Sequence, residues 1–204
     1  ALLSSEKDNT DKVVLYIDEA KHMGLKVLPP DVNESFPQFT VVGADTIRFG
    51  LAAVKNVGQT AIDAVIQGRI KLNRFKDFYN FTENVDLRVV NRKVLESLIK
   101  CGAFDSMGLY RSQLFAILDR ALGAAGEVQK DRESGQKSFF DLGDGGGFSQ
   151  KSANDIPKII EWPDNEKLLY EKEMLGFYVT GHPLSRYEKE LKSYSTVSVE
   201  TLAQ

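Results

Sequence analysis

Residues 51–66 read LAAVKNVGQTAIDAVI, in which two apolar segments flank the turn Asn56-Val57-Gly58. The segment 51–54 is expected to close a first helix. The buried face of a second helix is supplied by Ala61, Ala64, Val65 and Ile66. Asn tolerates a positive φ better than other residues except Gly, so Asn56 suits a tight turn. The pattern predicts two helices joined by a hairpin.

A hairpin of this kind can hold a DNA phosphate. The first backbone N–H groups of a helix lack intrahelical partners, and the helix dipole puts partial positive charge at the same end. Small turn residues let a ligand approach the backbone. The expected phosphate contacts are Lys55, Asn56, Val57, Gly58, Gln59 and Thr60. An ordinary helical turn without a ligand explains the same pattern, so the motif alone leaves both interpretations open.

The charge distribution divides the chain. The whole chain carries a net charge of -3, which by itself argues against nucleic acid. Residues 48–100, however, hold ten basic and five acidic side chains, a net of +5 that leaves -8 for the remainder. This division is expected if one part of a larger assembly faces phosphate, although ordinary solvated surfaces can produce it too.

Helical patterns continue from Gly50 to Gly123, with breaks at 56–58, 73–75 and 101–108. Asn91 is suited to cap a helix over 92–99. A second hairpin, which fits the pattern less well, is formed by this helix, the turn 101–108 and the helix after Tyr110. Its long turn contains an acid, which favours a purely structural role. Its first helix begins with Arg92 and Lys93, the two remaining predicted DNA contacts.

The N-terminal part is expected to be a small α+β unit. Residues 11–23 have the pattern of an amphipathic helix that stops at Gly24. An extended path should follow through Pro29-Pro30, and residues 39–42 and 46–49 are typical of a β-hairpin. The fold class is therefore mainly α: a small α+β start with a β-hairpin, a tandem helix-hairpin-helix bundle, a flexible linker and C-terminal helices.

The C-terminal third has a different composition. The segment 141–149 is rich in Gly and Asp and cannot bury enough surface to offset its ordering entropy, so residues 127–154 are expected to form a linker. Order should return near Trp162-Pro163, with a helix through Met174 and a short helix from Ser185 to Lys192. The final residues end without a stop signal, which suggests truncation of a longer protein.

Several classes are excluded by the bulk properties. The apolar runs are too short for a membrane span, and no secretory signal opens the chain. Cys101 is the only cysteine, and His22 and His182 are far apart, so neither a disulfide nor a metal site is expected. We therefore expect a cytoplasmic protein with no metal and no cofactor.

Five segments together resemble the α subunit of bacterial DNA polymerase III, in the same order along nearly the whole chain. They are Tyr16 to Ala20, Val27 to Asn33, Ile47 to Leu51, Leu95 to Asp105 and Gly176 to Leu184. The resemblance implies a non-catalytic piece of a DNA-directed DNA polymerase, whose catalytic carboxylates lie in an earlier palm domain. No catalytic residue is therefore assigned.

The resemblance also implies a division into regions and a set of partners. The regions are the end of the fingers (1–48), the tandem helix-hairpin-helix module (49–126), a flexible linker with a clamp-binding peptide (127–160) and a helical lead into a truncated OB-fold (161–204). The partners are duplex DNA bound through its backbone without sequence preference, the sliding clamp and other replicase subunits; no membrane is involved.

The linker contains a peptide that fits the clamp-binding pattern of this family, Gln-x-x-hydrophobic-Phe. It consists of Gln136, Lys137, Ser138, Phe139 and Phe140. A flexible arm can present two adjacent aromatic rings to an apolar pocket while Gln136 bonds at the rim. Phe139 departs from the Leu or Met more usual in the family.

Two other classes of function remain as alternatives. In a standalone interaction protein the hairpin would be structural and the linker peptide would bind another partner. An independent DNA enzyme, such as a nuclease or glycosylase, could use the same hairpin. No Asp, Glu or His cluster at catalytic spacing supports the enzyme, and apparent truncation at both ends argues against the standalone protein.

Overall fold

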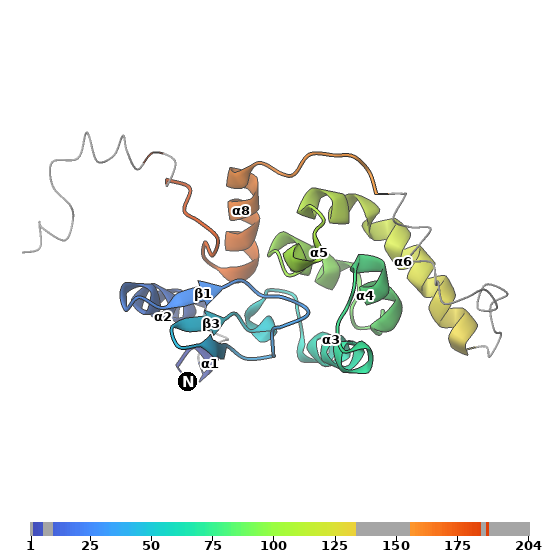
Figure 1. Ribbon diagram of the computed structural model, residues 1–204, viewed down its shortest axis with the longest axis horizontal. Coiled ribbons are helices and arrows are strands. Elements are labelled where there is room, and N and C mark those ends of the chain that lie inside the picture. Colours follow the sequence, from blue (N-terminus) through green and yellow to red (C-terminus); the bar gives the residue numbers. More distant parts are fainter. Residues whose placement is uncertain (1, 6–9, 134–155, 185–186, 188–204) are drawn as a thin grey trace, which may run out of the picture.

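Helices form most of the molecule, and a small sheet lies at the end that carries the N-terminus (Figure 1). The computed structural model describes residues 2–5, 10–133, 156–184 and 187. The α-helices are α1 Leu2–Ser5, α2 Thr10–His22, α3 Gln59–Leu72, α4 Phe78–Asn84, α5 Arg92–Lys100, α6 Arg111–Glu133 and α8 Asp164–Leu175. Two single-turn 3₁₀ helices are η1 Leu51–Ala53 and η2 Asp105–Met107. The predicted fold class, mainly α with a small β part, is confirmed.

The sheet has three strands in the order β1-β3-β2. Strands β2 Thr40–Gly43 and β3 Thr46–Arg48 pair antiparallel, which confirms the predicted β-hairpin. Strand β1 Lys26–Leu28 pairs parallel with β3, where the sequence predicted only an extended path. Pro29-Pro30 ends β1 because proline has no N–H for the ladder.

Local signals in the sequence set several helix ends. Gly24 lies two residues after the end of α2 and adopts φ 81°, a left-handed conformation that glycine favours. The Asn91 side chain accepts a hydrogen bond from the Val94 N–H and caps α5, as predicted. Asp77 caps α4 in the same way through the Asn80 N–H.

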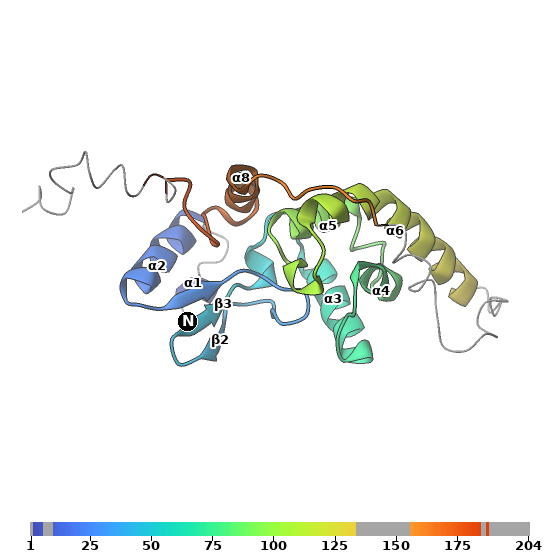
Figure 2. The same cartoon turned by 45° about the horizontal axis from the view of Figure 1, so that its top comes forward.

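The core runs without interruption from the N-terminal elements to α8. Helix α6 packs on α4 and α5, and α8 packs on α5 between the two ends of the elongated molecule (Figure 2). Phe104 makes edge contacts with Phe78 and Phe81, with ring centroids 5.1 and 4.9 Å apart. Aromatic packing thus joins the segment after α3 to the second hairpin.

The predicted linker begins too early. Helix α6 continues to Glu133, past the expected boundary at Glu127, because the Gln129 side chain donates to the carbonyls of Thr82 and Val85 and holds this end of α6 against α4. Helix α8 follows Trp162-Pro163 as predicted. The predicted helix from Ser185 to Lys192 lies outside the described residues except for Tyr187. No helix in the described ranges is long and apolar enough to span a membrane.

Candidate nucleic-acid interface

The first hairpin lies between η1 and α3. Its first predicted helix is wrong: residues 51–53 form a single 3₁₀ turn, because Gly50 and Val54 on either side are extended. Val57 is buried and anchors the turn, whereas Lys55, Asn56, Gly58, Gln59 and Thr60 are exposed. Ile62 is fully buried at the centre of the α3 face, a position that the apolar pattern missed.

Asn56 shapes the turn through its backbone and its side chain. It adopts φ 66°, which confirms that Asn fills the position needing a positive φ. Its Nδ2 donates to Ser97 Oγ at 3.1 Å, and Ser97 Oγ donates in turn to the Lys93 carbonyl. The hairpin is thereby fixed to the middle of α5.

The N-terminus of α3 is open to a ligand. Gly58 is the N-cap residue, and it makes no side-chain cap bond, so the first amides of α3 keep unsatisfied donor capacity. A side chain built at Gly58 would meet no atom within 4 Å, and its φ is -79°, so the backbone here is accessible and unstrained. The Gln59 side chain turns along α3 and donates to Asp63.

Helix α8 contacts this hairpin, which the sequence did not predict. The Lys55 N–H donates to the Met174 carbonyl at 2.9 Å, so this amide is not available to a ligand. Lys55 also lines a hollow of about 380 Å³ with Lys172 and Glu173 of α8. A second lysine thus stands beside the turn, more than a hundred residues away in sequence.

The two predicted DNA contacts on α5, Arg92 and Lys93, differ in whether their charge is paired. Arg92 forms ion pairs with Glu96 and Asp119, so its charge is already compensated. Lys93 is exposed and has no recorded ion pair within the described part of the chain. Of these two residues, Lys93 is therefore the better placed to meet a phosphate.

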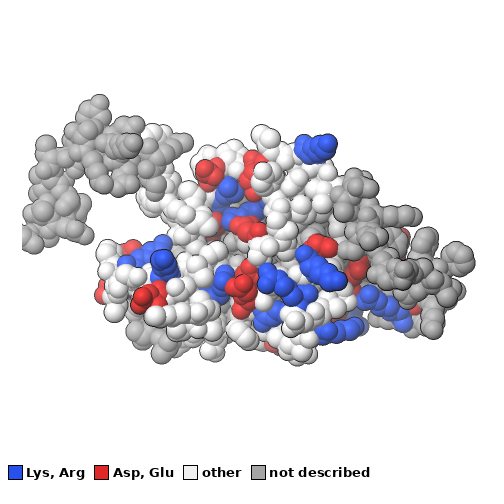
Figure 3. Space-filling model, viewed as in Figure 1, with Lys and Arg blue, Asp and Glu red and all other residues white. Residues whose placement is uncertain are grey.

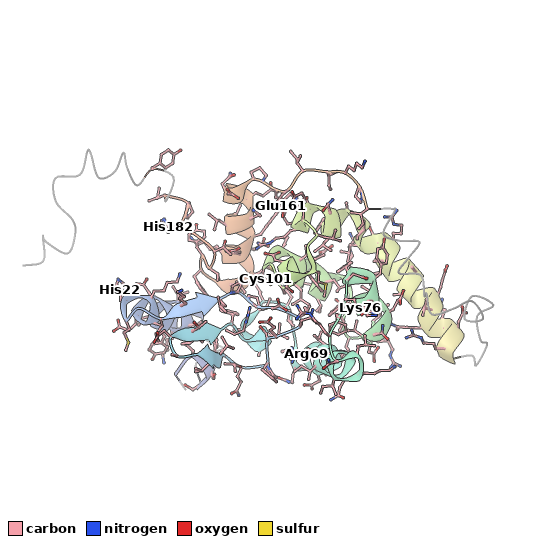
Figure 4. The ribbon with its side chains drawn as sticks, in the orientation of Figure 1. His22, Arg69, Lys76, Cys101, Glu161 and His182 are labelled. Carbon is pink, nitrogen blue, oxygen red and sulfur yellow. The ribbon has the colours of Figure 1, made fainter. Side chains whose placement is uncertain are left out.

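The second hairpin consists of α5, η2 and α6, and its helix N-terminus is occupied. Glu161, labelled in Figure 4, accepts hydrogen bonds from the N–H groups of Arg111 and Ser112 at the start of α6, at 3.0 and 3.1 Å. Burial opposes the charge of Glu161, but these bonds and a third from the Trp162 N–H outweigh it and lower the Glu161 pKa. An internal carboxylate therefore takes the place that a phosphate would need.

Arg111 ties this second hairpin to α8. Its side chain is 4% exposed and forms ion pairs with Asp105 at 2.7 Å and with the fully buried Glu171 at 3.1 Å. Burial disfavours the Arg111 charge, but the two carboxylates outweigh it and raise the Arg111 pKa. The acid in the turn, Asp105, is thus a structural partner of Arg111.

The predicted clamp-binding residues Gln136, Lys137, Ser138, Phe139 and Phe140 lie outside the described residues. Within the described ranges, no group of three or more His, Cys, Asp or Glu side chains could hold a metal ion. Cys101 is fully buried, and burial raises the pKa of its thiol to about 12.

Comparison with known proteins identifies a family match that includes the first hairpin. Residues 24–114 match a protein family described as the helix-hairpin-helix motif. The chain is 38% identical over 204 residues to the DNA polymerase III subunit alpha of Vibrio cholerae, covering 100% of this chain and 17% of that protein. The corresponding protein of Saccharopolyspora erythraea is 40% identical over 206 residues, again 17% of its length. That of Mycobacterium leprae is 41% identical over 204 residues, also 17%.

The similarity extends over essentially the whole chain, and the chain spans about 17% of the length of these relatives. The family resemblance expected from the sequence is therefore confirmed. The chain is related along its length to one segment of the bacterial DNA polymerase III alpha subunit, and it carries a helix-hairpin-helix motif within residues 24–114.

Proposed function

We propose that this chain binds the backbone of duplex DNA through the first hairpin, Lys55 to Thr60, without reading base sequence. The observation that carries the proposal is the open N-terminus of α3 inside a helix-hairpin-helix match. Orphan amides and the positive end of the helix dipole favour a phosphate oxygen at this position. Lys55 and Lys172 add positive charge beside it.

The role of this contact follows from the longer relatives. In a protein that copies DNA, a backbone grip of this kind steadies duplex product irrespective of its sequence. We expect weak binding by the chain alone, with a dissociation constant on the order of 10⁻⁴ to 10⁻⁶ M at physiological salt. We propose catalysis of DNA synthesis and contacts with other replicase subunits only for a protein as long as these relatives, and not for this chain alone.

Clamp tethering is a second proposed function, carried by Gln136 to Phe140. The support is the sequence pattern, in which two adjacent phenylalanines follow a glutamine in a polar segment. Together with the hairpin, such a tether would raise processivity by keeping the DNA-bound protein near its clamp.

Gly58 allows a sharp test of the hairpin. Asp and Asn are both good N-cap residues, and a side chain at Gly58 meets open space, so both Gly58→Asp and Gly58→Asn should fold at least as stably as the parent chain. Only Asp adds a negative charge at the phosphate position. We expect Gly58→Asp to weaken duplex binding about tenfold or more, and Gly58→Asn to weaken it far less.

Lys55 gives an independent test of the same site. Lys55→Glu should weaken duplex binding, and Lys55→Ala should make the slope of log K against log salt less steep by about one. Fluorescence anisotropy with a labelled duplex measures both quantities. Unchanged binding in both Lys55→Glu and Gly58→Asp would remove this hairpin from the DNA contact.

The clamp proposal has its own test, because it involves different residues. Replacing Phe139 and Phe140 with alanine should abolish measurable binding of the chain to purified sliding clamp and leave duplex affinity unchanged. Lys55→Glu is the matched control and should retain clamp affinity. If the double alanine variant still binds the clamp, the clamp-binding residues lie elsewhere.

A further inference from the structure

The connection between α3 and α4 carries a group of exposed cations. It consists of Lys71 in the last turn of α3, with Arg74 and Lys76 beyond it, and is called the basic turn below. Figure 3 shows Lys and Arg side chains gathered over the face formed by α3 and α4, and Figure 4 labels Lys76 beside α4. The basic turn lies at the opposite end of α3 from the hairpin.

Most other cations of the positively charged segment are already compensated. Those that are paired or buried are Arg48, Arg69, Arg88, Arg92 and Lys100. Lys71, Arg74 and Lys76, by contrast, have no ion pair recorded among the described residues. The nearest acid in sequence, Asp77, caps α4 through the Asn80 N–H. The net positive charge of this segment therefore concentrates at the basic turn and near the hairpin.

The backbone of the basic turn is held in one conformation. Asn33 pairs with both backbone groups of Phe75: its Nδ2 donates to the Phe75 carbonyl at 3.0 Å, and its Oδ1 accepts from the Phe75 N–H at 2.8 Å. The Phe75 ring is buried against Phe81, and the Lys76 N–H donates to Asn80 Oδ1. A ligand would meet cations on a preorganised backbone, which lowers the entropy lost on binding.

Fold stability does not account for this charge. Lys71 can interact favourably with the negative, C-terminal end of the α3 dipole, but Arg74 and Lys76 lie beyond that helix. Lys76 stands just before the N-terminus of α4, where positive charge is unfavourable. The dipole argument thus leaves Lys76 without a stabilising role, and its place with Lys71 and Arg74 on a fixed and exposed turn points to an external anionic partner.

We infer that the basic turn is a second contact with the phosphate backbone of the same DNA duplex that the hairpin holds. This inference rests on the proposed duplex binding. The 14 residues of α3 separate the two contacts by about 21 Å, which corresponds to roughly six phosphates along one strand. Two contacts at this spacing fix the direction of the duplex on the protein, which one hairpin cannot do.

The test removes the three charges and compares a matched control. The test variant is Lys71→Gln, Arg74→Gln, Lys76→Gln; the control is Lys26→Gln, Lys130→Gln, Lys158→Gln, three exposed lysines on other parts of the chain. Both change the net charge equally. Binding to a blunt duplex of roughly two helical turns is measured over a salt series. The slope of log K against log salt should become less steep by about three in the test variant and by less than one in the control.

The outcomes separate this inference from the proposed hairpin site. Equal effects of the test and control variants, or no effect of the test variant, would overturn the basic turn as a contact. Loss of binding in Gly58→Asp together with an unchanged test variant keeps the hairpin and removes the basic turn. The reverse result keeps the basic turn and removes the hairpin. Circular dichroism melting of each variant confirms that the fold is retained.

Discussion

Asn56 combines two demands that few residues meet together. The turn requires a positive φ, and the neighbouring Ser97 hydroxyl requires a hydrogen-bond donor. Glycine adopts a positive φ easily but has no side-chain donor for Ser97, whereas most other residues offer neither. Asn56 therefore provides the backbone geometry that glycine could also provide, and it adds an anchor to α5.

Substitutions at Asn56 should separate these two contributions. Asn56→Ala loses the bond to Ser97 and places a Cβ-bearing residue at φ 66°, so it should lower the free energy of unfolding by about 1–2 kcal/mol. Asn56→Gly loses the same bond without the backbone cost and should be the more stable of the two variants. Urea denaturation measures both, and equal stabilities would show that the positive φ carries no cost here.

Gly102 offers a second prediction at this scale, with Gly108 as its control. Both residues adopt a positive φ, 79° and 80°. A Cβ at Gly102 would lie 2.3 Å from Arg111 Nη2, whereas one at Gly108 would meet nothing within 4 Å. Gly102→Ala should therefore cost about 2–4 kcal/mol, because it also displaces a buried arginine, and Gly108→Ala about 1 kcal/mol. Similar losses in the two variants would contradict the steric part of this argument.

At the scale of elements, the N-termini of α3 and α6 differ in what fills them. The start of α3 has no side-chain cap, whereas the start of α6 holds the Glu161 carboxylate. Both helices follow a turn that the sequence predicted as a hairpin. The difference arises from a segment 50 residues further along the chain, and of the two helix starts it leaves that of α3 open for the proposed phosphate contact.

Helix α8 supplies the prediction at this scale. Glu171 is fully buried and accepts bonds from Arg111 and from the N–H groups of Val179 and Thr180, whereas Glu173 pairs with Lys100 and is half exposed. Glu171→Ala leaves Arg111 buried with one carboxylate fewer and should cost about 3–5 kcal/mol. Glu173→Ala, on the same helix, should cost at most about 1 kcal/mol. Thermal unfolding measures both, and equal losses would show that the buried pair does not hold α8 in place.

Local signals allowed many of the elements to be predicted. The β-hairpin, the caps at Asn91 and Gly24, the positive φ of Asn56 and the start of α8 depend on residues a few positions apart. Features that depend on distant partners were not predictable: β1 becomes a strand by pairing with β3, and α6 extends because Gln129 reaches α4. The same holds at the site, where Lys172 and Ser97 approach the hairpin only through packing.

At the scale of the whole molecule, the end of α8 and the segment that follows it connect parts that are distant in sequence. Phe177 packs against Phe49 with ring centroids 5.6 Å apart, and the Lys21 ammonium donates to the Tyr178 carbonyl at 3.2 Å. The Lys55 N–H meets Met174 in the same region. The N-terminal unit and the hairpin are therefore both held by residues 174–178, and the core they form is continuous.

A continuous core predicts that the described part of the chain unfolds in one cooperative transition. Trp162, the single tryptophan, packs against Phe115 and Tyr170 and reports on the C-terminal part. A second protein, Tyr16→Trp with Trp162→Phe, moves the fluorescent reporter to α2 in the predicted 1–48 region. Within each protein, the denaturation midpoint from fluorescence should coincide with that from circular dichroism, because contacts across residues 174–178 couple both ends. An earlier fluorescence transition in the protein with its reporter on α2, and in that protein alone, would show that residues 1–48 unfold as a separate unit.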